Sequence, residues 1–279
     1  MSCSYVSLLT TDDYVDGLLV LVHSLRETKS SYDCHVLLTS DISPRIHSIL
    51  AKHGIAYTIV SSISNPTDVN MAHRWFRTYS KIHVFGLTQY EKVVYLDADM
   101  LILENIDTLF ERPHMSATDA GSMLPSTSHW THMNSGLFVA TPSALLFDDM
   151  LSRAGKIEPL ASGGTADRPR CGSDQDFINA YYPAWRQQAD LHLDHKYNML
   201  HYHMDAYNRY HGYTLVPGPK RVAVLHYASY LKPWTQGRDA IAKLPVVGGS
   251  ALEASSLQLW SDAYDRMCNN PNSSSEWQS

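Results

Sequence analysis

Two aspartates in this 279-residue chain, Asp97 and Asp99, lie two residues apart and could bind a metal ion together. They directly follow the apolar run Lys92–Leu96, which is predicted to form a β-strand. Side chains two residues apart on an extended segment point to the same side, so both carboxylates can reach one ion. Such ligands favour Mn²⁺ or Mg²⁺, which can bridge a diphosphate and stabilise it as a leaving group. The alternative is an ordinary polar turn, because Asp-x-Asp is a short and common pattern.

The first hundred residues alternate short β-like runs with amphipathic helical runs. This order is typical of βαβ units and predicts an α/β fold, with a mostly parallel central sheet flanked by helices. Ser43, Pro44 and Gly54 mark the start and the end of the second helix. Ligands of open α/β sheets bind beyond the carboxyl ends of the strands, which is where the two aspartates are expected. The predicted strands are 5–10, 35–39, 55–60, 92–96, 136–140 and 221–225, and the predicted helices begin at about Asp12, Ser43, Ser80 and Asp174.

The composition favours one folded domain and limits its partners. The chain is 44% apolar and 18% charged, which is enough to build a sizeable core. Its net charge of -6 argues against a surface for nucleic acid or an anionic membrane. The longest apolar stretch, 17–22, is too short to span a bilayer, and the N-terminus lacks the basic residues of a signal peptide. The cysteines are scattered without metal or disulfide spacing, so reduced thiols and a cytoplasmic location are expected.

Further blocks of sequence accompany the aspartates. Residues 95–110 read Tyr-Leu-Asp-Ala-Asp-Met-Leu-Ile-Leu-Glu-Asn-Ile-Asp-Thr-Leu-Phe. The other blocks are Leu9-Thr-Thr11 with Tyr14 and Gly17, Tyr79-Ser-Lys-Ile82, Asn134-Ser-Gly-Leu-Phe138, Asp174-Gln-Asp-Phe-Ile-Asn179, and His226 followed by Lys232-Pro-Trp234. In this order they resemble family 8 glycosyltransferases, and glycogenin in particular, over about residues 5–235. The resemblance implies one GT-A domain over 1–268, and the polar composition of 269–279 predicts a flexible tail.

The resemblance also implies that the chain binds a UDP-hexose through a metal ion, Mn²⁺ or Mg²⁺. The implied metal ligands are Asp97, Asp99 and His226. The other implied donor-binding residues are Thr10, Thr11 and Tyr14 for uracil and ribose, Arg74 and Lys81 for sugar and phosphate, Ala98 between the aspartates, Asn134 and Ser135 for sugar hydroxyls, and Ser229 and Lys232 for the diphosphate. Ser229 departs from the glycine of the family pattern. Simpler alternatives remain for several of these residues: Thr11 as a helix cap, Lys81 as a solvated helix residue, and Arg77 in place of Arg74.

Asp174 and Gln175 are the implied catalytic residues, because this pair lies next to the anomeric carbon in the family. A retaining transfer needs either a carboxylate that attacks from the far face or a front-face reaction through a short-lived oxocarbenium ion, and the sequence leaves both routes open. Asp174 could instead be only a helix cap. The Cys171-Gly-Ser173 block lacks the family's carboxylate on the acceptor side. The loop predicted over 158–172 is long enough to be a lid or an acceptor-side element.

The acceptor is expected to be a glycan on another cytoplasmic protein. The sequence leaves UDP-galactose and UDP-glucose open, as well as transfer to a cyclitol in the manner of galactinol synthase. It also leaves open the self-glucosylation of glycogenin, for which Tyr202, Tyr207, Tyr210 and Tyr213 are candidates. Glycogenins carry a segment that docks glycogen synthase after the catalytic domain, and nothing comparable is found in 269–279. The resemblance further implies a homodimer.

Two other classes of protein share part of this pattern. A dinucleotide-dependent oxidoreductase is excluded, because no G-x-G-x-x-G follows the first predicted strand. A catalytically silent UDP-sugar-binding module is disfavoured by the full set of Asp97, Asp99, His226 and Lys232, which a binding module has less reason to keep. His201 and His203 lack further ligands at metal spacing, so their Tyr/His-rich run is expected to line an acceptor groove rather than a metal site.

Overall fold

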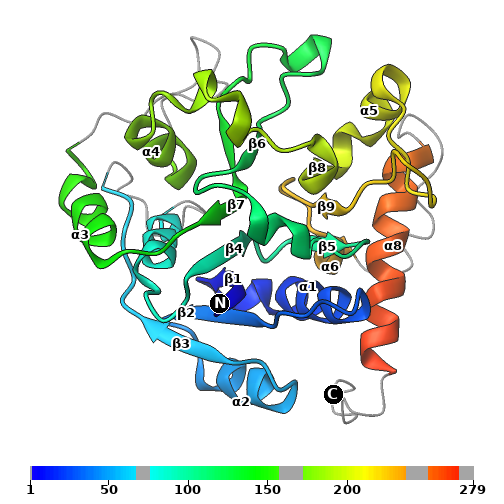
Figure 1. Cartoon of the computed structure of the whole chain (residues 1–279). Helices are drawn as coiled ribbons and strands as arrows, with labels where there is room; N and C mark the ends of the chain where they lie inside the picture. Colours follow the sequence, from blue (N-terminus) through cyan, green and yellow to red (C-terminus); the bar gives the residue numbers. More distant parts are fainter. Residues whose placement is uncertain (1, 67–75, 157–171, 237–250, 270–279) are drawn as a thin grey trace.

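A computed structural model of the chain describes residues 2–66, 76–156, 172–236 and 251–269 (Figure 1). Arg74, nearly all of the predicted loop 158–172 and nearly all of the predicted tail 269–279 lie outside the described residues. The main sheet has the order β3-β2-β1-β4-β7-β6. Its strands are β1 (Cys3–Leu9), β2 (Cys34–Thr39), β3 (Tyr57–Val60), β4 (Lys92–Leu96), β6 (Ala117–Asp119) and β7 (Met133–Ala140).

The first four strands of the main sheet run parallel, which confirms the predicted α/β fold with a mostly parallel central sheet. β1 pairs in parallel with both β2 and β4, and β2 pairs in parallel with β3. β7 then lies antiparallel to β4, and β6 antiparallel to β7. β4 is therefore central, and the residues that follow it emerge at the middle of one sheet edge, where parallel strands end.

A second, three-stranded sheet connects the segment after the aspartates to the C-terminal part of the chain. Its order is β5-β9-β8, formed by β5 (Met100–Ile102), β9 (Val224–His226) and β8 (Met199–Leu200). β5 and β9 are antiparallel, with Met100 paired to His226. Compared with the strand predicted over 221–225, β9 begins three residues later and ends one residue later, because pairing with β5 rather than the apolar run sets its limits. This shift brings His226 directly beside the aspartate segment.

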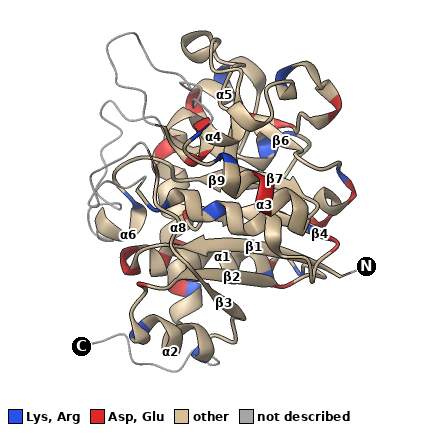
Figure 2. Ribbon diagram, turned by 90° about the vertical axis from the view of Figure 1, so that its left-hand side faces the viewer, with Lys and Arg blue, Asp and Glu red and all other residues tan. Residues whose placement is uncertain are grey.

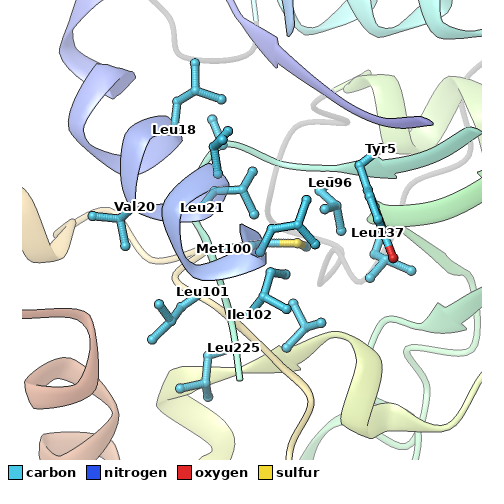
Figure 3. Packing of buried hydrophobic residues seen from close by; sticks show 14 of the residues in the cluster. Tyr5, Leu18, Val20, Leu21, Leu96, Met100, Leu101, Ile102, Leu137 and Leu225 are labelled. Atoms are coloured by element: carbon cyan, nitrogen blue, oxygen red, sulfur yellow. The ribbon is translucent and has the colours of Figure 1, made fainter. Parts of the chain in front are cut away.

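The larger hydrophobic core lies between this small sheet, the main sheet and two long helices, α1 (Val15–Glu27) and α8 (Ala251–Cys268). Residues 17–22 of α1 are all buried, so this part of the helix is enclosed on every side and not only along one apolar face. Figure 3 shows Leu21 of α1 next to Met100 of β5, with Leu225 of β9 close by. Because Met100 directly follows Asp99, this packing anchors the metal-binding candidates to the most buried part of the molecule.

A second core covers the other face of the main sheet and is rich in aromatic residues. Phe138 stacks between Phe85 and Tyr95, with ring centroids 5.6 and 5.0 Å apart. The covering elements are η2 (Thr78–Gly86), α3 (Ala144–Arg153) and α4 (Asp174–Tyr181). η2 is a 3₁₀-helix rather than the α-helix expected from about Ser80, and α3 was not predicted. Helices therefore flank both faces of the sheet, as expected for this class of fold.

The remaining elements lie around these two cores. α2 (Pro44–Lys52) begins with Pro44 and ends before Gly54, whose φ of 59° is left-handed, as the sequence predicts. Figure 1 and Figure 2 place α2 and α5 (Met204–His211) at opposite ends of the molecule. No helix in the described ranges combines the length and the apolar composition needed to cross a bilayer. The short elements are α6 (Pro233–Gln236), η1 (Asp12–Tyr14), η3 (Asp107–Glu111), η4 (Pro125–Thr127), η5 (Trp185–Gln187), η6 (Ala189–Leu191), η7 (His195–Tyr197) and η8 (His201–His203).

Candidate active site

The structure brings Asp97, Asp99 and His226 together at the end of β4. One ligand atom from each lies within 4.8 Å of the others. His226 Nε2 is 3.2 Å from Asp99 Oδ1 and 3.8 Å from Asp97 Oδ2. A small divalent ion binds its ligands at about 2 Å, so adjacent ligand atoms lie roughly 3 Å apart. The three side chains therefore fit a Mn²⁺ or Mg²⁺ ion with only small movements of the Asp97 and His226 side chains.

Backbone hydrogen bonds hold the three candidate ligands in place. The Asp97 N–H donates to the Gly136 carbonyl at 2.8 Å, and the Tyr227 N–H donates to the Asp99 carbonyl at 2.9 Å. Ala98 is buried between the aspartates, and its carbonyl faces Gly17 of α1. A Cβ on Gly17 would lie 2.7 Å from that carbonyl oxygen and 2.6 Å from the Trp234 ring. The glycine is thus required where α1, the aspartate segment and the Lys-Pro-Trp block meet.

Lys81 lies at the centre of the site and is only 4% exposed, so it is not a solvated helix residue. Its Nζ is 2.7 Å from Asp174 Oδ2 and 3.1 Å from Asp97 Oδ1, and it also donates to the Ser135 carbonyl at 3.1 Å. Burial alone would lower the pKa of Lys81, but Asp174 and Asp97 outweigh it, and the pKa lies above its ordinary value. The buried ammonium group of Lys81 therefore forms ion pairs with two carboxylates, those of Asp97 and Asp174.

Lys232 occupies the opposite side of the aspartate pair. Its Nζ donates to Asp99 Oδ2 at 2.6 Å and to the Tyr227 carbonyl at 2.7 Å. Burial alone would raise the pKa of the Asp99 carboxyl, but His226 and Lys232 outweigh it and hold this pKa well below its usual range. Burial does raise the pKa of the Asp97 carboxyl, and the charges of Asp99 and Asp174 add to the rise while Lys81 opposes it.

The two predicted catalytic residues begin α4, facing Ser135 of β7. Ser135 Oγ donates to Asp174 Oδ2 at 2.9 Å, and the Ser135 N–H donates to Gln175 Oε1 at 3.1 Å. The cap of α4 is Ser173, whose hydroxyl accepts from the Asp176 N–H in a capping box. Asp174 is therefore not the helix cap, and its side chain points to Lys81 and Ser135 instead.

The expected nucleoside-binding residues lie at the end of β1. Thr11 occupies the N-cap position of η1, but its side chain accepts no capping hydrogen bond. Thr10, like Thr11, is half-buried and directly follows the strand. The Tyr14 ring packs edge-on against Trp234, with ring centroids 5.4 Å apart, and Lys232 Nζ lies 5.4 Å from the centre of the Tyr14 ring. Tyr14 therefore lies beside the Asp99–Lys232 pair.

Two other predicted donor residues, and Arg77 as the alternative to Arg74, have partners within the protein. Asn134 Oδ1 accepts from the Gly136 N–H at 2.9 Å and from Asn198 Nδ2 at 3.0 Å. Ser229 Oγ donates to the Leu231 carbonyl at 2.7 Å, so this hydroxyl stabilises its own turn. Arg77 forms an ion pair with Asp41 and does not contact the cluster around Asp97.

Sequence reasoning missed two residues that contact the candidate metal ligands. Tyr95 Oη donates to Asp97 Oδ1 at 2.8 Å. Asn198 Oδ1 lies 2.8 Å from His226 Nδ1. The pattern of β4 gave Tyr95 a place in the strand but not the direction of its hydroxyl. Asn198 follows the 3₁₀-helix η7 and belongs to no spacing pattern with His226, so only the folded chain identifies it.

Comparisons with known proteins agree with this arrangement. The profile of glycosyl transferase family 8 matches residues 5–237. Glycogenin-1 of Caenorhabditis elegans is 32% identical over 246 residues, which cover 84% of this chain and 51% of that protein. Inositol phosphorylceramide glucuronosyltransferase 1 of Arabidopsis thaliana is 34% identical over 180 residues, which cover 64% of this chain and 30% of that protein. The chain thus spans about half or less of the length of these two relatives.

Glycogenin-1 of Oryctolagus cuniculus is matched over more of its length, at 30% identity across 253 residues that cover 86% of this chain and 68% of that protein. Among solved structures, the galactosyltransferase LgtC in complex with donor and acceptor sugar analogues has a TM-score of 0.60 at 18% identity. The match covers 97% of this chain and 98% of that chain. This likeness shows a GT-A fold, as predicted. The profile match over most of the sequence shows that the chain belongs to glycosyl transferase family 8.

Proposed function

We propose that this chain is a retaining glycosyltransferase that transfers a hexose from a UDP-sugar to a hydroxyl of an acceptor, within a single GT-A domain over 1–268. The observation that carries the proposal is the buried cluster in which Asp97, Asp99 and His226 meet Lys232 on one side and Lys81 with Asp174 on the other. A silent binding module would need the metal-binding half of this cluster. It would have no use for a buried carboxylate beside a cation at the start of α4.

A divalent ion held by Asp97, Asp99 and His226, which we propose to be Mn²⁺, with Mg²⁺ as the alternative, would neutralise the charge of the departing diphosphate. Lys232 lies on the same side as Asp99, and its flexible side chain can contact a phosphate oxygen there. Tyr14 and the end of β1 would contact the uracil and ribose beyond it. Because the net charge of the chain is negative, the metal ion and Lys232 would have to balance the negative charge of the donor locally.

Asp174 and Gln175 are proposed to act at the anomeric carbon. Among the described residues, the contacts made by Lys81 Nζ and Ser135 Oγ both go to Asp174 Oδ2. The other oxygen, Oδ1, is therefore the one left to meet the sugar, either as a nucleophile or as a hydrogen-bond acceptor in a front-face reaction. Gln175 is held through Oε1, which leaves the two amide hydrogens on Nε2 to donate to the substrate.

The donor sugar is proposed to be galactose or glucose, and the acceptor a glycan on another protein. A homodimer and a cytoplasmic location complete the proposal. The location is supported by Cys3 and Cys34, which form no disulfide within the described part of the chain, as is typical of a reducing compartment. Transfer to a cyclitol is the alternative for a small acceptor.

The test is a panel of UDP-galactose, UDP-glucose and UDP-glucuronate, incubated with the purified chain and Mn²⁺ while UDP release is measured. UDP-glucuronate belongs in the panel because a relative is named for glucuronosyl transfer. We expect release from UDP-galactose or UDP-glucose, its loss in EDTA, and its return when Mn²⁺ is restored. Binding of the donor without release from any sugar would make the chain a binding module and overturn the proposal.

Self-glucosylation is a second candidate, because Tyr202 and Tyr210 are 37% and 55% exposed. Tyr207 and Tyr213 are buried, and their hydroxyls contact His195 and Asp194, so they are poor acceptors as folded. Intact-mass spectrometry after incubation with the donor and Mn²⁺ distinguishes the two candidates. A ladder of hexose additions that disappears in Tyr202→Phe or Tyr210→Phe would replace transfer to another molecule by self-modification.

A further inference from the structure

The two ring nitrogens of His226 face different groups. Nε2 faces the two aspartates, at 3.2 Å from Asp99 Oδ1 and 3.8 Å from Asp97 Oδ2. Nδ1 faces the side-chain amide of Asn198, with Oδ1 at 2.8 Å. A ring nitrogen binds a metal only through its lone pair, so the nitrogen that keeps its proton decides whether this histidine can be a ligand.

A backbone amide identifies the protonated nitrogen. The Gly136 N–H can only donate, so the Asn134 atom that it contacts at 2.9 Å must be the oxygen, Oδ1. The Asn198 atom 3.0 Å from that oxygen must then be a donor, which makes it Nδ2. The remaining Asn198 atom is the acceptor Oδ1, and the nitrogen that it meets must donate. The order of bonds therefore places a proton on His226 Nδ1.

Packing keeps the ring in this orientation. A Cβ on Gly136 would lie 2.5 Å from His226 Cε1 and 2.9 Å from Nδ1, so the ring lies directly against the glycine backbone of β7. Asn198 and His226 are both buried, and β8 pairs with β9 just beside them. Rotating the ring by half a turn would remove Nδ1 from Asn198 and leave the amide oxygen without this donor.

From this geometry we propose that Asn198 is a positioning residue that keeps the proton on His226 Nδ1 and directs Nε2 toward Asp97 and Asp99. The inference rests on the metal site of the proposed function, but it concerns hydrogen bonds that are present without an ion. Groups that bind the second nitrogen of a histidine ligand fix its tautomer and its direction. Here the group is an asparagine anchored through Asn134 to the backbone of β7.

The same bonds change what is expected of Asn134. The family resemblance assigns this side chain to the hydroxyls of the transferred sugar. Its oxygen already accepts from Gly136 and Asn198, so it contributes Nδ2 as a donor to a sugar hydroxyl rather than Oδ1 as an acceptor. One side chain would then connect the position of the metal ligand to the position of the sugar.

The first test reads the proton directly in the wild-type protein. Two-bond ¹H–¹⁵N correlation spectra of protein labelled with ¹⁵N-histidine distinguish the two ring nitrogens, and His226→Gln identifies the signal. We expect Nδ1 to be protonated both without metal and in the presence of Mg²⁺ and UDP, with Nε2 changing on metal addition. A His226 that carries its proton on Nε2 and none on Nδ1 would overturn the proposal.

The second test measures Mn²⁺ affinity by calorimetry in the presence of UDP. Asn198→Leu should weaken Mn²⁺ binding by about 10- to 100-fold, the usual effect of losing such a partner. Asn198→Asp still accepts from Nδ1–H and should recover most of that loss. Equal Mn²⁺ affinity in wild type and Asn198→Leu would contradict the proposal.

The matched control is Asn179→Leu. Asn179 is also buried and makes hydrogen bonds to Met133 and Gln175, but it does not touch a candidate metal ligand. This variant should lower the free energy of unfolding without changing the Mn²⁺ affinity or the protonation of His226. If wild type bound no Mn²⁺ at all, the proposed metal site would fail, and the NMR result would still decide the role of Asn198.

Discussion

The two sides of the Asp97–Asp99 pair differ in how their charges are balanced. On the η2 side, Lys81 is shared between Asp97 and Asp174. On the β9 side, Lys232 contacts Asp99 and His226 faces the same carboxylate. The Asp97 side chain is 27% exposed and that of Asp99 only 9%, yet the pKa is raised for Asp97 and lowered for Asp99. Burial in itself raises both pKa values; for Asp99 the charges of His226 and Lys232 outweigh it, whereas for Asp97 the shared Lys81 does not.

The difference matches the two tasks proposed for the site. The β9 side places Lys232 beside Asp99, where its positive charge suits a diphosphate, while Asp97, Asp99 and His226 supply the ligand atoms that a metal needs. The η2 side holds two carboxylates close together on one lysine and places Asp174 where the sugar is expected. Separate variants of the two lysines and the two aspartates can therefore test whether the sides act as described.

The largest effect is expected on the η2 side, from Lys81→Met. The change leaves Asp97 and Asp174 close together without their shared cation, which should lower the free energy of unfolding by about 3–5 kcal/mol. Mn²⁺ would restore positive charge beside Asp97, so it should raise the melting temperature of this variant more than that of wild type. Urea unfolding and thermal melts with and without Mn²⁺ provide the measurement. A variant as stable as wild type would mean that the two carboxylates do not depend on Lys81.

The next largest effect is expected from replacing each of the two aspartates by asparagine. Asp99→Asn removes a candidate ligand and leaves buried Lys232 without its carboxylate, whereas after Asp97→Asn Lys81 still contacts Asp174. Both variants should lose about 100- to 1,000-fold in kcat/KM if the metal stabilises the leaving group. Only Asp99→Asn should also lose clearly in stability. Equal melting temperatures for the two variants would show that the charge balance of the two sides is not different.

A smaller effect is expected from Lys232→Met. A charge-assisted contact to phosphate is present before and after the bond breaks, so UDP affinity should fall by about 10- to 100-fold together with transfer. Calorimetry with UDP in excess Mn²⁺ measures this, and Lys220→Met on a distant turn is the control. Unchanged UDP affinity would remove Lys232 from the diphosphate site.

The smallest effect is expected at acidic pH, where protonation of His201 beside β9 should lower the free energy of unfolding. Burial, together with the nearby Lys232 charge, lowers the pKa of His201 to about 4, and His201 contacts the His226 carbonyl. Its unfolded pKa is near 6.5, so the unfolded chain takes up the proton first, and stability is lost as the pH falls from about 6.5 toward 4. At pH 5 the free energy of unfolding should be about 1–2 kcal/mol lower than at neutral pH. His201→Gln should flatten the pH dependence of urea unfolding between pH 7 and 5, and an unchanged slope would contradict the assignment.

The sequence predicted those parts of the site that depend on local pattern. Asp97 and Asp99 stand out because a strand and a two-residue spacing place both carboxylates on one side. The role of Lys81 was harder to predict, because a lysine within a helical run is usually exposed to solvent. It is buried here because the 3₁₀-helix η2 packs against β7. The register of β9 was missed because pairing with β5 sets it. Asn198 was missed because a hydrogen bond among three distant segments leaves no trace in spacing.

The Lys232–Asp99 bond joins residues 133 positions apart in the sequence. Closing so long a loop is slow relative to the pairing of β1 with β2, although its entropic cost grows only weakly with length. The order of folding events follows from this separation. During refolding, the parallel strands should acquire amide protection well before β9 docks on β5. Tight binding of the divalent metal ion would then appear only in the last kinetic phase of refolding, and it would report that the chain has finished folding.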